Sequence, residues 1–173
     1  MEESSAIASL TARPAQREDA AAITEIYNQG IEDRIATFET EPRSVADIMP
    51  WFDHAHGFVS VTDASGDVVG YAVAHPYSDR CCYRGIGEFS VYVRRSHRGR
   101  GIGQVAMAAL IEASRADGLW KLISRIFPEN RASLSLMARM GFKQLGVHEK
   151  HGKLDGVWKD CVIVERLIVE NID

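Results

Sequence analysis

The chain has 173 residues, 46% of them hydrophobic and 25% charged, which is enough for one domain with a hydrophobic core and too short for two ordinary ones. A net charge of −4 argues against a general affinity for nucleic acid or membrane surfaces, because that affinity depends on net positive charge. The three cysteines, two of them adjacent, argue against a disulfide framework, and no His or Cys spacing predicts a metal site.

The N-terminal segment is acidic and is followed by no long apolar run. We therefore expect no signal peptide, no membrane span and a cytoplasmic protein. Residues 1–8 are expected to be disordered, residues 9–169 to form the domain, and residues 170–173 to be a C-terminal tail.

The remainder reads as alternating strands and helices. We predict strands at 8–13, 58–62, 68–74, 85–93, 121–126, 142–149 and 158–168, and helices at 20–29, from Ser44 to about 55, from 102 to about 117, and at 133–140. Strands that alternate with helices, together with an antiparallel run, predict a mixed, centrally parallel sheet with helices on both faces.

The strand that ends in Val91, Tyr92 and Val93 runs into a basic, glycine-rich turn, Arg98-Gly99-Arg100-Gly101-Ile102-Gly103-Gln104. Apolar residues at helical spacing follow it, so the turn opens a helix, whose N-terminus favours a phosphate. The glycines lack the Cβ that would hold a pyrophosphate away from the backbone, and the two arginines add charge-assisted donors. The spacing matches neither the dinucleotide fingerprint nor the Walker loop.

The spacing of Arg98, Gly101 and Gly103 closely resembles the coenzyme signature of GCN5-related N-acetyltransferases. A second segment, from Ser124 through Pro128, Asn130 and Ser133 to Gly141-Phe142, is similar to that family's second signature. The resemblance covers residues 10–168 and implies a single-domain α/β (α+β) fold with a mixed, twisted sheet of about seven strands, splayed at the central parallel pair. It implies acetyl-CoA as co-substrate and no metal, with the coenzyme held by Val91, Tyr92, Val93, Arg98, Gly99, Arg100, Gly101, Ile102, Gly103, Gln104, Asn130 and Ser133.

Two residues of the second segment leave questions open. The side chain of Asn130 can cap its helix or turn outward to the pantetheine arm, and the two roles are compatible. Many relatives carry a tyrosine at the position of Met137, where it protonates the departing thiolate. A thioether cannot donate a proton, so this role is either unnecessary here or filled by water or substrate.

Glu88 is the informative carboxylate on the acceptor side. Glutamate is depleted in strands, and strand alternation places Glu88 on one face with Ser90 and Tyr92. A carboxylate beside a coenzyme cleft can remove the proton from an ammonium acceptor, directly or through water. The alternative is a structural ion pair with an arginine.

Several segments resemble the phosphinothricin and arsinothricin N-acetyltransferases: the strand around Glu88, and residues 38–42, 80–83 and 156–160. This resemblance makes Glu88 the base and implies that Phe38, Arg80 and Tyr83 line the amino-acid pocket. Arg80 can pair with a carboxylate, phosphinate or arsonate tail, or be a solvated loop arginine. Phe38 and Tyr83 can equally be core or lid aromatics. Residues 150–153 depart from the subfamily pattern, which bears on the substrate side chain.

We therefore expect an enzyme that transfers acetyl from acetyl-CoA directly to the α-amine of a small glutamate analogue, of the phosphinothricin, arsinothricin or methionine sulfone and sulfoximine type. Such transfer detoxifies the acceptor and confers resistance. Trp158 is expected at a subunit interface or pocket rim, and a homodimer is expected as in the subfamily. The alternatives are a ribosomal-protein or peptide N-terminal acetyltransferase and a non-catalytic acyl-CoA-binding regulatory module.

Overall fold

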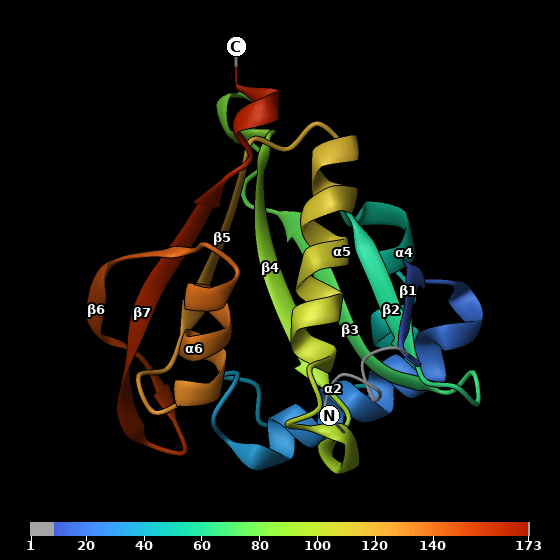
Figure 1. The fold of residues 1–173 in the computed structure, drawn as a ribbon. Helices are drawn as coiled ribbons and strands as arrows, with labels where there is room; N and C mark the ends of the chain where they lie inside the picture. The colour runs from blue at the N-terminus through green and yellow to red at the C-terminus, as the bar shows by residue number, and fades with distance from the viewer. Residues whose placement is uncertain (1–8, 173) are drawn as a thin grey trace.

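The computed structural model describes residues 9–172, so the expected disorder of residues 1–8 lies outside the described residues (Figure 1). Seven strands form one sheet in the order β1-β2-β3-β4-β5-β7-β6, in which only β4 and β5 are parallel. The expected mixed sheet with a central parallel pair is confirmed. The strands are β1 (Thr11–Pro14), β2 (Phe58–Thr62), β3 (Val68–Pro76), β4 (Ile86–Val93), β5 (Lys121–Ile126), β6 (Lys143–Leu154) and β7 (Val157–Leu167).

Helices cover both faces of the sheet, and each face has its own hydrophobic core. On the near face in Figure 1, α5 (Ile102–Ala116) and α6 (Arg131–Arg139) pack on the strands around Met107, Leu110 and Leu122. On the other face, α2 (Ala20–Asp33) packs on β3 around Ile23, Ile26 and Tyr71. No helix in the described part of the chain is long and apolar enough to cross a membrane.

The second predicted helix is two short helices, α3 (Val45–Ile48) and α4 (Trp51–His54). Ser44 caps the first as expected, because its side chain accepts a hydrogen bond from the Asp47 N–H. The interruption falls at Pro50, which has no N–H to continue the helical ladder and whose ring crowds the preceding turn. The prediction of one continuous helix from 44 to 55 was therefore wrong.

The first of the two closing strands, β6, is longer than predicted, because it ends at residue 154 and not at 149, and the two strands form a hairpin. They meet at Asp155 and Gly156, both of which have positive φ angles, 49° and 78°. Two successive positive φ angles are the geometry of a tight hairpin turn, for which Asp-Gly is a preferred pair. Strand β6 is an edge strand of the sheet, and β7 lies between it and β5.

The parallel strands β4 and β5 stay paired over only three residue pairs, of which Glu88 with Ile123 is the last. Beyond that pair the two strands diverge, as Figure 1 shows. The Ser124 hydroxyl donates to the Phe89 carbonyl at 2.9 Å and so satisfies one backbone group that the splay leaves without a ladder partner. The splay opens the sheet between Val91 and Ile126, and Glu88 lies at its closed end.

Candidate active site

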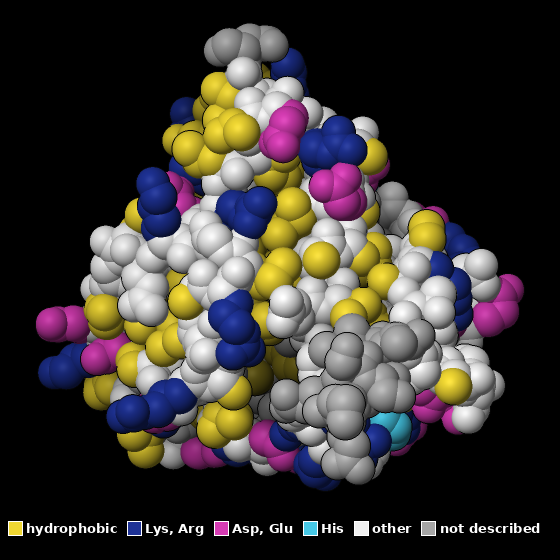
Figure 2. Space-filling view, viewed as in Figure 1, with side chains coloured by type: hydrophobic (Ala, Val, Ile, Leu, Met, Phe, Trp, Pro, Cys, Tyr) yellow, Lys and Arg dark blue, Asp and Glu magenta, His cyan; other side chains and the backbone are white. Residues whose placement is uncertain are grey.

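A cavity of about 620 Å³ lies where the splayed strands meet α5 and α6. In Figure 2 the same region is a hollow floored by hydrophobic side chains between these two helices. All the predicted coenzyme-binding residues except Arg100 line it. Arg100 is exposed and does not line this cavity, so its role in coenzyme binding stays a prediction.

The glycine turn fits a pyrophosphate for a stereochemical reason. Gly99 and Gly101 have φ angles of 77° and 79°, a left-handed conformation that other residues adopt only with strain. Gly101 is the N-cap of α5, so the first N–H groups of that helix have no intrahelical acceptor. A Cβ on Gly103 would lie 3.0 Å from Leu136 Cδ2, so this glycine keeps α5 close to α6 on the cavity wall.

Asp33, at the end of α2, forms ion pairs with Arg98 of this turn and with Arg95 just before it. Its carboxylate lies 2.6 Å from Arg98 Nη1 and 2.7 Å from Arg95 Nη2. Its partial burial alone would raise the pKa of Asp33, but the two arginines outweigh it, and the pKa of this carboxyl lies below its ordinary value. Asp33 therefore stays ionised near neutral pH and fixes Arg98 at the cavity wall.

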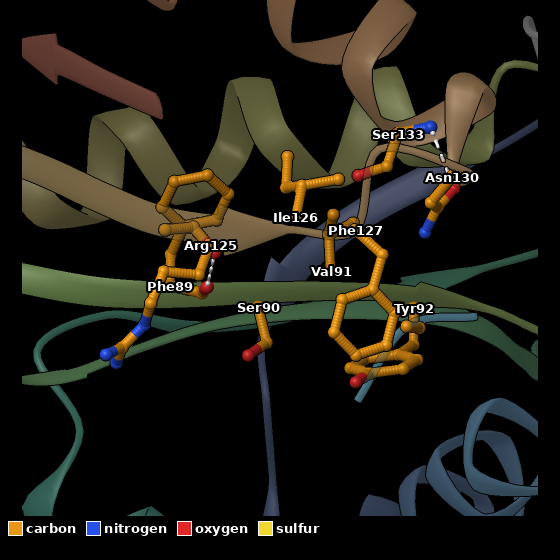
Figure 3. A pocket seen from close by; sticks show the side chains of 11 residues that line it. Phe89, Ser90, Val91, Tyr92, Arg125, Ile126, Phe127, Asn130 and Ser133 are labelled. Carbon is orange, nitrogen blue, oxygen red and sulfur yellow. Dashed lines mark hydrogen bonds between the residues drawn. The ribbon is translucent and has the colours of Figure 1, made fainter. Parts of the chain in front are cut away.

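A smaller cavity of about 70 Å³ continues between β4 and β5 (Figure 3). Asn130 caps α6, because its side-chain oxygen accepts a hydrogen bond from the Ser133 N–H at 3.2 Å. Its amide nitrogen is turned away from that helix in Figure 3, and Asn130 lines both this cavity and the larger one. The geometry thus combines the cap with a donor that a pantetheine amide could use, so the two roles are compatible here.

Two predicted residues lie differently from a simple reading of the motif. The side chain of Met137 is 1% exposed and belongs to the core, so the position of the missing tyrosine does not face either cavity. The ring of Tyr92 stacks on Tyr71 with centroids 5.7 Å apart and meets Tyr27 edge-on. Burial raises the pKa of Tyr92, so its phenol stays protonated.

Glu88 lines a third cavity, also of about 70 Å³, together with Tyr77, Arg125 and His148. Its carboxylate forms an ion pair with Arg125, the interaction that the structural alternative expected. The side chain of Glu88 nevertheless remains 35% exposed, so the carboxylate is also accessible from the cavity. His75 on β3 is the residue paired with Glu88 in the β3–β4 ladder. Burial lowers the pKa of His75, and the negative charge of Glu88 partly offsets this effect.

The predicted acceptor residues come from two separate places. Arg80 and Tyr83 lie on the exposed loop before β4, where the Arg80 guanidinium lies 5.5 Å from the Tyr83 ring centroid. Tyr83 in turn packs edge-on against Tyr77 of the Glu88 cavity, at 5.9 Å. Phe38 instead packs on Phe127, whose side chain lines the cavity between β4 and β5.

Sequence reasoning gave no role to Arg125, Tyr77 or His148. The signal for Arg125 was present, since it lies within the second motif, but only the β4–β5 register places it beside Glu88. His148 lies on β6, which is separated from β5 in the sheet by β7. No local sequence pattern predicts that His148 lies near Glu88. Tyr77 directly follows β3, and its N–H donates to the carbonyl of Ile86 on β4, so the end of the β3–β4 ladder places it at the cavity.

Comparison with known proteins places this geometry in a family. Residues 21–142 match the acetyltransferase (GNAT) family. The chain is 33% identical over 165 residues to the phosphinothricin N-acetyltransferase of Streptomyces coelicolor, covering 92% of this chain and 96% of that protein. It is 34% identical over 161 residues to the L-methionine sulfoximine/L-methionine sulfone acetyltransferase of Pseudomonas aeruginosa, covering 91% and 94%.

Solved structures agree with this placement. The crystal structure of a GNAT superfamily phosphinothricin acetyltransferase from Sinorhizobium meliloti, in complex with acetyl-CoA, superposes with a TM-score of 0.84 at 30% identity. The match covers 92% of this chain and 88% of that one. The family match spans more than half of the chain, and the relatives align over nearly its full length. The chain therefore belongs to the GNAT family of acetyltransferases.

Proposed function

We propose that the protein transfers the acetyl group of acetyl-CoA to the α-amine of a small amino acid that resembles glutamate, such as phosphinothricin, arsinothricin, methionine sulfone or methionine sulfoximine. The proposal is supported by the relatives at about one-third identity, whose names state acceptors of this kind: phosphinothricin, methionine sulfoximine and methionine sulfone. Such a reaction would remove the charge of the amine and so detoxify the acceptor.

One observation carries this proposal. The large cavity shares Val91, Asn130 and Ser133 with the small cavity between β4 and β5, and that small cavity shares Ser124 and Arg125 with the Glu88 cavity. The three cavities therefore follow one another along the splay. A thioester that reaches through the splay would end beside the carboxylate of Glu88. This arrangement supports direct attack within a ternary complex.

The chemistry follows from the two cavities. The acceptor ammonium gives a proton to Glu88, directly or through water, and its nitrogen lone pair becomes available. That nitrogen attacks the thioester carbonyl and the new C–N bond forms. As the tetrahedral intermediate collapses, the C–S bond breaks, the sulfur leaves as the coenzyme thiolate, and the nitrogen gives up its second proton, which passes through water to that thiolate. A thiolate is a tolerable leaving group because its pKa is about 8.5, so the core position of Met137 is not a barrier.

On the acceptor side, Arg80 is proposed to bind the tetrahedral oxyanion tail, with Tyr83 as the aromatic surface beneath its guanidinium. Phe38 is proposed to close the opposite side, since it packs where the loop after α2 meets Phe127. Gly152 on β6 fits against Phe38, because a Cβ there would lie 2.8 Å from its ring.

We also propose that the chain forms a homodimer through the hairpin of β6 and β7. Its outer surface exposes several large apolar side chains, which a partner would cover: Leu145, Val147, Val157 and Trp158. Sedimentation or light scattering tests this directly. A dimer that a charged substitution at Val147 dissociates is the expected result, and a monomer at all concentrations contradicts it.

The activity itself is tested by following thiol release from acetyl-CoA with a panel of acceptors. The panel contains phosphinothricin, arsinothricin, methionine sulfone, methionine sulfoximine, glutamate and a short peptide. We expect the highest kcat/KM with one of the four glutamate analogues. Turnover of the peptide alone would instead favour an N-terminal acetyltransferase, and coenzyme binding without any turnover would favour a regulatory module.

A further inference from the structure

Arg125 has a position that its ion pair with Glu88 does not fully explain. It lies on β5 one residue beyond Ser124, is 44% exposed, and lines both the cavity between the splayed strands and the Glu88 cavity. Figure 3 shows its side chain reaching away from Asn130 and Ser133 toward the far end of the pocket. A surface ion pair would not require a side chain that faces both cavities.

The guanidinium also keeps donors available. An arginine has five N–H donors in a planar fork. Among the described residues, Glu88 is its only hydrogen-bond partner, through one nitrogen. The remaining N–H groups are therefore free to bind a ligand, and the contact with Glu88 fixes the fork in one orientation.

The charges around the Glu88 cavity favour an anion beside this arginine. Glu88 is the only acidic residue that lines the cavity, and it is already paired. The other side chains that line it are the phenol of Tyr77, the imidazole of His148, the hydroxyl of Ser124 and two isoleucines, Ile123 and Ile163. A second carboxylate entering here would meet donors, with no further negative side chain to repel it.

An adjacent carboxylate and guanidinium match the head group of a free α-amino acid, which carries an ammonium and a carboxylate on one carbon. We propose that Arg125 binds the α-carboxylate of the acceptor while Glu88 takes the proton of its α-amine. This inference rests on the proposed function and deepens it: the acceptor class is amino acids with a free α-carboxylate. Simple amines, amino-acid amides and peptides lack that group and bind poorly.

A pair of matched acceptors tests the inference. Methionine sulfone is compared with the amine that remains when its carboxyl group is removed, for the wild type, Arg125→Gln and Arg125→Lys. We expect Arg125→Gln to lower kcat/KM for the amino acid about 10- to 100-fold, mainly by raising KM. The kcat/KM for the amine should change little. Arg125→Lys keeps the charge without the fork and should recover part of the loss.

The control is Arg115→Gln, which removes an arginine of similar exposure, 45%, from an ion pair with Glu112 on α5. This variant should change kcat/KM for neither acceptor. If Arg125→Gln lowers kcat/KM equally for both acceptors, Arg125 acts only by positioning Glu88 and the inference is overturned. An unchanged rate with the amino acid overturns it as well.

A binding experiment separates this inference from the proposed function. Calorimetry measures methionine sulfone and its decarboxylated amine against each protein in the presence of coenzyme A. We expect the wild type to bind the amino acid more tightly than the amine, and Arg125→Gln to lose the difference. If acetyl transfer fails but this difference is found, the proposed function falls and the carboxylate site stands. Equal binding of both compounds by the wild type contradicts the carboxylate site.

Discussion

Replacing Glu88 by glutamine removes the proposed base with little change in shape. The side chain is 35% exposed and its partner Arg125 is 44% exposed. Ion pairs this exposed contribute about 0–1 kcal/mol to stability, and the amide oxygen can still accept from the arginine. The variant should therefore fold, with a free energy of unfolding within about 1 kcal/mol of the wild type.

The expected kinetic effect is much larger. Loss of a general base lowers the rate by about 10²–10⁴, equivalent to about 3–5 kcal/mol of transition-state stabilisation. Acetyl-CoA binding should be unchanged, because Glu88 lies outside the residues that line the large cavity. Activity should partly recover as the pH approaches the pKa of the acceptor amine, since more of the acceptor then arrives as the free base.

The assay is thiol release from acetyl-CoA at saturating coenzyme, from neutral to alkaline pH, with coenzyme binding measured separately by calorimetry. Glu112→Gln serves as the control, because it alters an exposed glutamate that also pairs with an arginine. A Glu88→Gln protein with a near-wild-type rate at pH 7 would refute the role of Glu88 as base. A protein that does not fold would show that the ion pair with Arg125 is structurally essential, contrary to its exposure.

Three further substitutions test other parts of the account. Gly101→Val places a β-branched residue at φ 79° and should raise the KM for acetyl-CoA about tenfold or more, whereas the acceptor KM stays nearly constant; equal changes in both would count against the phosphate turn. Arg80→Ala should raise the acceptor KM about tenfold in steady-state kinetics and leave coenzyme binding intact, and an unaltered acceptor KM would make Arg80 a surface residue. Asp19→Asn should lower the free energy of unfolding by about 2 kcal/mol in denaturant titrations at pH 7, because the buried carboxylate accepts from Arg13 and Ser60. Burial alone would raise the pKa of Asp19, but these hydrogen bonds lower it. The stabilisation by Asp19 is therefore present above about pH 4, and the difference in free energy of unfolding between variant and wild type should shrink as the pH falls below that. A difference that stays constant down to about pH 2 would contradict the assignment.

Much of the fold could be predicted because local signals were strong. The bounds of β2 and β5 agree with the structure, and α5 begins at the residue after the glycine turn, as expected. The two errors have local causes. Pro50 breaks a helix whose apolar pattern runs on through it, and the Asp155–Gly156 turn extends β6 beyond its predicted end at residue 149.

The site divides in the same way. The predicted residues of the large cavity fall in two local motifs, the glycine turn with the strand before it and the segment that begins at Asn130, so their part of the cavity could be predicted. Its remaining wall, from Gly30 to Ala36, carries no such motif. The Glu88 cavity is assembled from β4, β5, β6, β7 and the residue after β3, and its residues meet only through strand order and register. Arg125 illustrates this, since its distance from Glu88 depends on a parallel pairing of three residues that no local pattern reveals.

The central claim is that the acetyl group passes directly from acetyl-CoA to the α-nitrogen of an amino acid bound beside Glu88. Mass spectrometry and NMR of the products of one reaction, with phosphinothricin or methionine sulfone as acceptor, test it most directly. The account predicts one acetyl group on the α-nitrogen for each coenzyme thiol released, and an unmodified protein. Thiol release without an N-acetylated product, or acetyl retained on the protein, would contradict it.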